Sequence, residues 1–590
     1  MKTEWDLSYL EEGSFEEKRE KIREKTQDFI DKWRKDISYL EKESSLKEAL
    51  DEYENLAANY LEGGDEYYYF YLKTQLDENN PEIRAKLNKS DSFRKEINNK
   101  LNFFEINLSK IPRDKQEEFL KSGILKDYKH LLESLFIKGK HILTEKEEKI
   151  MSLKSSSSYS FWVDMLSGFL SKEEAVLDEK TGEKRSYSEI RSLMDNSQKE
   201  IREKASKAFN SIIKRYEDVA ENELNAILEN KKVDDELRDY KRPDESRHIE
   251  DDIETEIVDS LIDSVSDNFR ISQRFYSLKA KLMGVEKFTY SERSIDFGKI
   301  SKNLDYESSV DLIREVFSRL DEKFGEVLNK FLEEGLINAL PKKGKRDGAC
   351  CISSLKKNPI FVLLNYTGRI RDVTTFAHEI GHAIHMSLMK EKNNALNIGT
   401  PKSTAEVAST FMEDFVLDEL LKTANEEDRL IIMMQKLQED ISTIFRQIAC
   451  YKFEQVLHEK FREKGYLSKN EIGELFSEKM KEYLGDSFER GDDMDRGWVY
   501  WPHIREYFYN YSYSSGLLIS KSLQSLVKKD KNYVERVKEF LYAGTSDSPK
   551  NIFNKIGIDI SKKDFWEKGL KEVESLIDET ESLAKKLGKI

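Results

Sequence analysis

Helical periodicity runs through most of this 590-residue chain and constrains its fold more than any other feature. Apolar residues recur at three- and four-residue spacing with charged residues between them, which is typical of amphipathic helices. The chain has only 8 prolines and 26 glycines, so few residues interrupt a helix. The clearest segments are residues 15–36, 47–60, 188–230 and 253–283. The sequence therefore predicts an almost entirely α-helical protein.

Breaks in this helical pattern are few. We expect a break at residues 79–81, a small hairpin turn at 177–184 and a basic, flexible loop at 341–348. The one convincing strand, residues 360–366, is opened by Pro359, which favours an edge strand. We therefore expect a small β-sheet near residue 360 inside a helical body.

Charge and hydropathy exclude several classes of protein. The formal net charge is −16, with acidic and basic residues interleaved, whereas a nucleic-acid-binding protein should show a basic stripe. No apolar run is long enough to span a membrane, and the acidic N-terminus lacks the apolar core of a signal peptide. Cys350, Cys351 and Cys450 are too few and too irregularly spaced for a disulfide framework. We expect a soluble, cytoplasmic protein with reduced thiols.

The most informative string is His-Glu-Ile-Gly-His at residues 378–382. The surrounding residues 376–389 have a helical pattern, and we expect the helix to begin at an N-cap on Asp372 or Thr374. A string of this form arises by chance on the order of 0.01 times in such a chain. Three of the eight histidines lie in this helix, which weakens the alternative of an unrelated surface pair.

The spacing within this string predicts a metal site. His378 and His382 stand at positions i and i+4, so both imidazoles leave one face of the helix and can meet a single ion. Glu379 is turned about 100° around the helix, where it can reach a water molecule beside the metal without binding the metal. Gly381 leaves room for another backbone or a substrate to approach closely.

A zinc ion held by two histidines needs a third protein ligand and leaves a position for water. His385 lies roughly 10 Å along the helix axis from His378, too far to share the ion well. The longer H-E-x-x-H-x-x-G-x-x-H pattern is excluded because Leu388 stands where its last histidine would be. Residues 403–413 read as a later helix with small residues beside Glu406, which favours Glu406 as the third ligand.

Glu413 lies about two turns beyond Glu406 on the same helix face and suits a carboxylate that orients a ligating histidine. We assign it, with His385, to the surroundings of the ligands. Two nitrogens and one carboxylate favour one Zn²⁺ per chain. Zinc lowers the pKa of water and polarises a carbonyl, and Glu379 is expected to accept the proton of that water as general base.

At this point the sequence resembles a known family, the oligoendopeptidase F group of the thimet oligopeptidase superfamily. The resemblance covers nearly the whole chain and rests on Trp-Asp-Leu-Ser at 5–8, the signature across 348–385, Ala-Glu-Val-Ala-Ser-Thr-Phe at 405–411, Ala-Gly-Thr at 543–545 and Gly-Ile-Asp at 557–559. It implies a mostly helical, two-lobed body with zinc on the floor of a deep channel. Such a channel admits short peptides, excludes folded proteins and leads to cleavage within the peptide.

The resemblance also implies roles in the aromatic segment 501–516. A histidine followed by tyrosines in this segment donates hydrogen bonds to the tetrahedral intermediate, and His503 resembles that histidine. Tyr509 and Tyr513 are the preferred phenol donors, and Tyr511 is expected to contact the peptide. The tyrosines at 507, 509, 511 and 513 cannot all share one helical face.

Other residues are expected to bind the peptide or to divide the chain. The turn at Gly348 and Ala349 is expected to close over the peptide, and the strand at 360–366 to pair with its backbone. We predict an N-terminal helical lobe, residues 1–195, and a metallopeptidase region, residues 196–590. The protein is expected to act as a monomer or small homo-oligomer.

Two alternative functions remain open at this stage. A zinc metallocarboxypeptidase on a related helical scaffold would need a cationic pocket, for which Arg369, Arg371 and Arg505 are candidates. A non-catalytic, zinc-stabilised peptide-binding protein would have no need of Glu379 as a general base.

Overall fold

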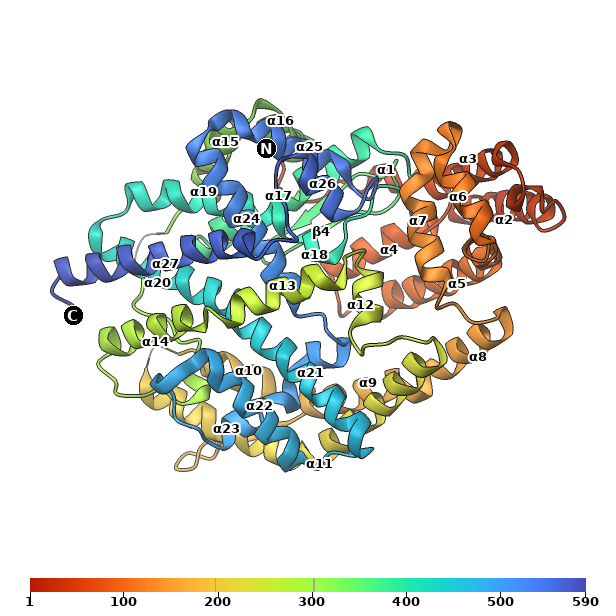
Figure 1. Ribbon diagram of the computed structural model, residues 1–590. Coiled ribbons are helices and arrows are strands. Elements are labelled where there is room, and N and C mark those ends of the chain that lie inside the picture. The colour runs from red at the N-terminus through yellow and green to blue at the C-terminus, as the bar shows by residue number, and fades with distance from the viewer. Residues whose placement is uncertain (197, 301–302) are drawn as a thin grey trace. The chain divides into compact units, whose positions relative to one another are not determined.

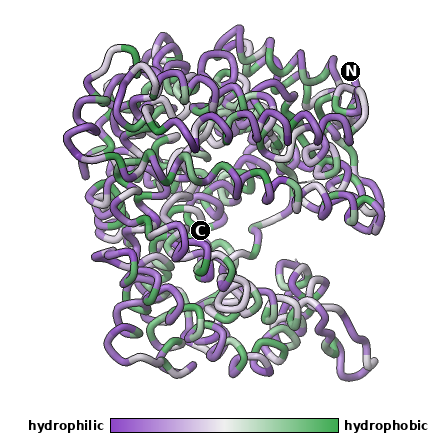
Figure 2. The backbone as a smooth tube through the Cα atoms, turned by 90° about the vertical axis from the view of Figure 1, so that its right-hand side faces the viewer, coloured by the Kyte–Doolittle hydropathy of each residue, from purple (hydrophilic) through white to green (hydrophobic). Residues whose placement is uncertain are grey.

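The computed structural model describes residues 1–196, 198–300 and 303–590. Helices make up most of these residues, and the strands form one two-stranded and one three-stranded sheet (Figure 1). The predicted fold class, mostly α with a small sheet, is therefore confirmed. Along the backbone, hydrophobic and hydrophilic residues alternate at short intervals, as amphipathic helices require (Figure 2). Among the described residues, no helix combines the length and the hydropathy that a membrane span requires.

The chain forms two compact units, and each is assembled from three separate stretches of sequence. The first unit contains residues 1–142, 302–422 and 523–559. The second unit contains residues 143–301, 423–522 and 560–590. This division differs from the predicted one at residue 195, because helices are grouped by the side chains they bury and not by their order in the chain.

The first unit is built from helices around a small sheet. Its helices are α1 (Ser8–Glu11), α2 (Phe15–Trp33), α3 (Glu43–Asn59), α4 (Gly64–Leu76), α5 (Pro81–Ser109), α6 (Arg113–Lys121), α7 (Lys129–Gly139), α15 (Tyr306–Leu320), α16 (Glu322–Glu334), α17 (Ile370–Lys392), α18 (Lys402–Ala405), α19 (Val407–Thr423), α25 (Val534–Ala543) and α26 (Pro549–Lys555). The aromatic residues Phe29, Trp33, Tyr39 and Phe104 anchor a buried core among α2, α3, α5 and α7. The predicted helices at 15–36 and 47–60 correspond to α2 and α3.

The three-stranded sheet lies in the first unit in the order β3-β5-β4. Its strands are β3 (Ile337–Asn338), β4 (Cys350–Ile352) and β5 (Phe361–Leu363). β5 corresponds to the predicted strand, but it pairs on both sides and is fully buried, so the prediction of an edge strand was wrong. Pro359 precedes the first paired residue and therefore costs the ladder no hydrogen bond. The edge strands are β3 and β4.

The N-terminal segment is packed onto this sheet. The Trp5 indole N–H donates to the carbonyl of Val362 at 2.8 Å, and the Trp5 ring lies edge-on to Phe361 with 5.5 Å between ring centroids. The loop at 341–348, predicted to be flexible, is anchored by Lys345, whose buried ammonium donates to the carbonyls of Asn338, Leu340 and Leu364. These contacts fix the sheet that leads into α17.

In the residues that the structure describes, the second unit is helical apart from one hairpin. Its helices are α8 (Glu145–Ser155), α9 (Phe161–Ser171), α10 (Tyr187–Leu193), α11 (Lys199–Leu237), α12 (Glu245–Glu250), α13 (Thr255–Ser266), α14 (Phe269–Met283), α20 (Glu426–Ile441), α21 (Gln447–Lys464), α22 (Lys469–Leu484), α23 (Asp492–Asp495) and α27 (Lys563–Lys586). The antiparallel strands β1 (Glu174–Asp178) and β2 (Glu183–Ser186) confirm the hairpin turn predicted at 177–184. The remaining helix, α24 (Tyr511–Lys529), begins in this unit and ends in the first.

Candidate metal centre and active site

The histidine pair lies on α17, which begins earlier than predicted. The helix starts at Ile370, with Arg369 as its N-cap residue, so neither Asp372 nor Thr374 is the N-cap. The Asp372 carboxylate instead accepts hydrogen bonds from the backbone N–H groups of Thr367 and Arg369, at 2.7 and 3.1 Å. An acidic side chain in the first helical turn satisfies donors that the helix leaves unpaired. This cap fixes the start of the helix that carries the histidines.

The three predicted ligands converge within the first unit. His378 Nε2 and His382 Nε2 lie 3.3 and 3.5 Å from the same oxygen, Oε2 of Glu406. The three donor atoms all lie within 4.8 Å of one another, and each side chain is partly exposed. The structure thus brings together residues from α17 and from the junction of α18 and α19 that the sequence places 24 residues apart or more.

Close packing of α17 against α19 makes this convergence possible. A Cβ atom on Gly381 would lie 2.7 Å from Ser409 Cα and 2.9 Å from the Ala408 carbonyl oxygen. Backbone atoms cannot give way as a flexible side chain can, so only glycine fits at this crossing. The close approach that Gly381 was predicted to allow is therefore present, and the small residues after Glu406 face it.

Glu406 occupies a break between two helices and not the middle of one. α18 ends at Ala405 and α19 begins at Val407, although the sequence predicted one helix across 403–413. The Ser409 hydroxyl donates to Glu406 Oε2 at 3.0 Å, which holds the carboxylate toward the histidines. Burial raises the pKa of Glu406, but hydrogen bonds from His378 and His382 outweigh it and hold that pKa far below its ordinary range.

Glu413 lies where the sequence placed it, beside a histidine. Its Oε2 atom is 3.0 Å from Nδ1 of His378. A carboxylate accepts at this distance from Nδ1–H, and that tautomer leaves the Nε2 lone pair for a metal ion.

Glu379 lies beside the histidine pair and is only 7% exposed. Burial raises the pKa of its carboxyl group, and the neighbouring His378 and His382 oppose that shift. A carboxylate with a raised pKa is a better proton acceptor than an exposed one, which suits a general base.

His385 is a core residue on the same helix, α17. Its ring packs against Phe540 of α25, with 5.2 Å between ring centroids, and it is 3% exposed. Burial lowers the pKa of His385 to about 3, so the ring is neutral. These contacts are those of a packing residue, and they do not include a hydrogen bond to a metal ligand.

The donor set fits zinc. Two imidazole nitrogens and one ionised carboxylate can supply three tetrahedral positions and leave one open, as catalytic zinc sites do. The Glu413 hydrogen bond to His378 is the kind of outer contact that orients a ligating imidazole. A hard-cation site for magnesium or calcium would need oxygen ligands instead.

The predicted peptide-binding turn leads into the edge strand β4. Gly348 has a left-handed φ of +82°, and a Cβ there would meet no atom within 4 Å. The Asn365 amide donates to the carbonyls of Arg346 and Gly348, at 2.8 Å each, which shapes the turn. Ala349 follows it and is partly exposed.

The second unit holds His503 among two tyrosines. Tyr513 Oη lies 3.2 Å from His503 Nε2, and the Tyr509 ring stacks on the imidazole at 5.6 Å between centroids. All three side chains are partly exposed. The structure thus brings together the histidine and the two tyrosines that were expected to donate to the tetrahedral intermediate.

The other two tyrosines of this segment point elsewhere. Tyr507 donates to the carbonyl of Ile227, and Tyr511 is fully buried and donates to Asp251 at 2.9 Å. The expectation that Tyr511 contacts the peptide is not supported at this position, because its hydroxyl is used inside the unit. α24 begins only at Tyr511, so Tyr507 and Tyr509 lie before the helix and do not follow its periodicity.

A strained turn connects His503 to α24. Tyr507 and Phe508 have φ values of +46° and +57°, which are rare for bulky residues. The buried Glu454 carboxylate holds the turn by accepting from the Phe508 N–H at 2.7 Å and from the Asn510 amide at 2.9 Å. Arg505 forms a buried ion pair with Glu223, at 2.7 Å, so it is committed within the unit.

Sequence reasoning missed two residues that surround His503. The Trp501 indole N–H donates to His503 Nδ1 at 3.3 Å, and the Arg446 guanidinium lies 3.9 Å from the centroid of the Trp501 ring. Trp501 stands two residues before His503, so its position was a usable signal. Arg446 lies far away in the sequence, and no local pattern indicates it.

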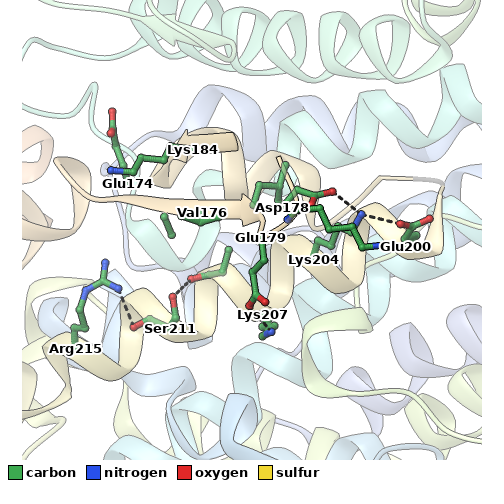
Figure 3. A pocket seen from close by; sticks show the side chains of 14 residues that line it. Glu174, Val176, Asp178, Glu179, Lys184, Glu200, Lys204, Lys207, Ser211 and Arg215 are labelled. Atoms are coloured by element: carbon green, nitrogen blue, oxygen red, sulfur yellow. Dashed lines mark hydrogen bonds and ion pairs between the residues drawn. The ribbon is translucent and has the colours of Figure 1, made fainter. Parts of the chain in front are cut away.

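A separate cavity of about 680 Å³ lies between the β1-β2 hairpin and α11 (Figure 3). Two of its lysines are paired with acids: Lys204 lies 2.9 Å from Asp178 and Lys207 lies 2.8 Å from Glu179. None of the candidate site residues lines this cavity.

Comparisons with known proteins give two family matches and several relatives. The model of the family described as "Peptidase family M3" matches residues 192–572, and the model described as "Oligopeptidase F" matches residues 107–166. Oligopeptidase PepF of Bacillus subtilis is 26% identical over 88% of this chain and 79% of its own length. The oligoendopeptidase F homolog of Borreliella burgdorferi is 25% identical over 95% of this chain and 94% of its own length.

Solved structures share the fold. The oligoendopeptidase-F of Enterococcus faecium superimposes with a TM-score of 0.70 at 18% identity, covering 97% of this chain and 99% of its own. PZ peptidase A with an inhibitor gives a TM-score of 0.72 at 16% identity, covering 95% of this chain and 97% of its own.

Proposed function

The chain belongs to peptidase family M3, and we propose that it is a zinc-dependent endopeptidase that hydrolyses internal bonds of short peptides. One observation carries this proposal. The ligand atoms of His378, His382 and Glu406 converge, and the buried Glu379 lies beside them without belonging to the group. Relatives named oligoendopeptidase F support cleavage within short peptides.

His378, His382 and Glu406 would hold one zinc ion, and Glu413 would orient His378. Bound zinc supplies Lewis-acid chemistry, which polarises a carbonyl and makes water more acidic. The Glu413 carboxylate keeps the Nδ1 proton of His378 engaged, so Nε2 stays available as a ligand atom.

Glu379 handles the protons of the reaction. Its carboxylate accepts a proton from the attacking water and passes it to the departing amine nitrogen. The burial that raises its pKa keeps bulk water away from the carboxyl group and strengthens it as a base.

His503 and Tyr513 stabilise the negative charge that develops on the former carbonyl oxygen. Their hydrogen bond to each other pre-orients both rings, and Tyr509 stacks against His503 to hold it. Removing one such donor typically lowers turnover by roughly 100- to 1,000-fold.

The peptide backbone would pair with β4. This strand is an edge of the sheet and follows Gly348 and Ala349, so backbone hydrogen bonds can hold a peptide with little demand on its sequence. The central strand β5 is paired on both sides, so it cannot pair with a peptide.

We propose that the enzyme acts in the cytoplasm as a monomer or small homo-oligomer. Its three free cysteines agree with that compartment.

A metallocarboxypeptidase is not favoured. One of the three arginines considered for a carboxylate pocket, Arg505, is buried in an ion pair with Glu223. A non-catalytic peptide-binding protein is not favoured either, because the family consists of peptidases and Glu379 is retained.

The test uses a set of peptides of increasing length, each blocked at both ends, with product masses read by mass spectrometry. We expect internal cuts in the short peptides, less cutting of the longer ones and no cutting of a folded protein. Cutting only of peptides with a free carboxyl end, one residue at a time, would contradict the endopeptidase proposal.

A further inference from the structure

We propose that Trp501 is a positioning residue that fixes the His503 ring in the neutral form with its proton on Nε2. This inference deepens the proposed function and rests on it, because His503 and Tyr513 are assigned there to the developing oxyanion. It adds a residue, Trp501, to which the sequence analysis assigned no role.

The hydrogen bond from Trp501 determines which nitrogen carries the proton. The indole N–H lies 3.3 Å from His503 Nδ1, and an indole nitrogen can only donate. Nδ1 must therefore offer its lone pair. In a neutral imidazole the proton then resides on Nε2.

That assignment sets the direction of the next hydrogen bond. The Tyr513 hydroxyl lies 3.2 Å from Nε2, so the phenol oxygen accepts the Nε2 proton. Tyr513 then directs its own proton to a different acceptor, and in the proposed reaction that acceptor is the oxyanion, so His503 acts on the oxyanion through Tyr513. With the proton on Nδ1, the same phenol would donate its proton to Nε2, and that proton would then be unavailable to the oxyanion.

The opposite tautomer is costly in this setting. Two donors, the indole N–H and Nδ1–H, would face each other, and a buried donor without an acceptor costs about 1 to 3 kcal/mol. A doubly protonated ring would meet the same clash. Burial also lowers the pKa of His503; Glu506 opposes that shift and Arg446 adds to it.

Trp501 is itself held firmly. It is 4% exposed, the Arg446 guanidinium covers its ring at 3.9 Å, and Phe476 packs edge-on at 6.1 Å. Pro502 follows and restricts the backbone between Trp501 and His503. Arg446 ends a π-helical turn, Ser442–Arg446, a distortion that often accompanies functional sites.

The test replaces the donor and keeps the ring. Trp501→Phe retains an aromatic ring for Arg446, removes the indole N–H and makes the side chain smaller by one ring. We expect kcat on a blocked peptide to fall roughly 10- to 100-fold, with KM within about twofold of the wild-type value, since the lost interaction belongs to the transition state.

The matched control is Trp566→Phe. Trp566 is fully buried in α27, and its indole N–H has no hydrogen-bond partner among the described residues. This substitution also replaces a buried tryptophan but removes no donor to a histidine, so kcat should be unchanged. A fall in kcat equal to that of Trp501→Phe would overturn the proposal.

A second readout does not depend on catalysis. In protein labelled with ¹⁵N at histidine, the His503 signals, identified by their loss in His503→Asn, should show a protonated Nε2 and an unprotonated Nδ1. In Trp501→Phe a mixture of tautomers is expected. A wild-type ring protonated on Nδ1, or an identical tautomer in both proteins, would overturn the proposal.

The two proposals fail in different ways. If His503→Asn and Tyr513→Phe keep the wild-type kcat, the oxyanion role in the proposed function is wrong, and so is the catalytic part of this inference. If those variants lose activity but Trp501→Phe retains full activity, only the positioning role of Trp501 is wrong.

Discussion

Two glutamates beside His378 have different tasks because they meet different atoms. A Glu413 oxygen lies 3.0 Å from Nδ1 of the His378 ring and orients that ring. Glu379 follows His378 along α17, is buried and does not belong to the group of ligand atoms. A substitution of Glu379 should therefore change catalysis, and a substitution of Glu413 should change metal affinity.

Glu379→Gln removes the proton acceptor and keeps the size of the side chain. We expect kcat to fall roughly 100- to 10,000-fold, because the proton of the attacking water loses its acceptor, while zinc affinity stays near the wild-type value. Steady-state kinetics and a zinc titration measure the two quantities. Glu391→Gln, an exposed acid at the end of the same helix, is the control and should change neither. Wild-type kcat in Glu379→Gln would refute the general-base role.

Glu413→Gln should weaken zinc binding about 10- to 100-fold, because the amide no longer holds the Nδ1 proton of His378 as a carboxylate does. Competition with a chromogenic chelator measures this affinity. At saturating zinc most of the activity should return. An unchanged affinity would show that Glu413 does not orient the ligand.

His248 in the second unit makes stability depend on pH. It is 1% exposed, its ring nitrogens lie 3.0 Å from Thr255 Oγ1 and 2.9 Å from Tyr451 Oη, and burial lowers its pKa to about 4. Between pH 6.5 and about 4 the unfolded chain binds a proton here that the folded chain does not. The free energy of unfolding should therefore fall as the pH drops through this window.

His248→Gln tests that sign. The variant should be less stable than wild type at pH 7.5, because two buried hydrogen bonds are altered, and the difference should shrink by roughly 2 kcal/mol at pH 5. Unfolding of both metal-free proteins is followed at the two pH values. An equal difference at both would contradict a neutral, buried His248.

At the scale of elements, the crossing of α17 and α19 decides whether Glu406 reaches the histidines. Gly381 permits the two backbones to approach, and Glu406 stands at the break just before α19. The site is thus a consequence of helix packing as much as of ligand chemistry.

Gly381→Ala should push these helices apart, because the new Cβ would lie 2.7 Å from Ser409 Cα. Overpacking of this kind costs about 1 to 3 kcal/mol, and zinc affinity should fall with it. Thermal unfolding and zinc titration measure the two effects. Gly168→Ala is the control: a Cβ on Gly168 in α9 meets no atom within 4 Å, so helix propensity should stabilise that variant. Equal effects of the two substitutions would contradict the packing argument.

The sequence predicted those elements whose signal is local. Strong periodicity placed α2 and α3 within a few residues, and α13 and α14 were merged because the short break at Asp267 and Asn268 resembles a polar helix face. β4 was missed because three residues are too few to show alternation, and β5 was placed at an edge because pairing partners cannot be read from one strand.

The candidate metal site was predictable for the same reason. His378 and His382 are neighbours on one helix, and the small residues beside Glu406 indicated that its helix packs closely against the helix of the histidines. The surroundings of His503 were only partly predictable. Tyr511 and Tyr507 look like Tyr509 in the sequence, and only the course of the turn at Phe508 separates the tyrosines near His503 from those bonded inside the unit.

At the scale of the whole molecule, two units built from interleaved stretches carry different parts of the proposed chemistry. The first unit contains the three metal ligands and Glu379, and the second contains His503 and its tyrosines. Neither stretch of sequence before or after residue 195 contains a complete unit, so separate expression of those halves should give no folded, active protein. Circular dichroism and peptidase activity of the two fragments check this expectation, and a folded, active fragment 196–590 would contradict it.

Dependence of peptide cleavage on zinc held by His378, His382 and Glu406 is tested by a zinc titration of the metal-free enzyme, with cleavage of a blocked peptide as the readout. We predict no cleavage without metal, a linear rise as zinc is added and a plateau at one zinc per chain, with no activity regained by Glu406→Gln at the same zinc concentrations. Cleavage that persists in the metal-free enzyme, or full recovery by Glu406→Gln, would contradict a zinc-dependent reaction at this site.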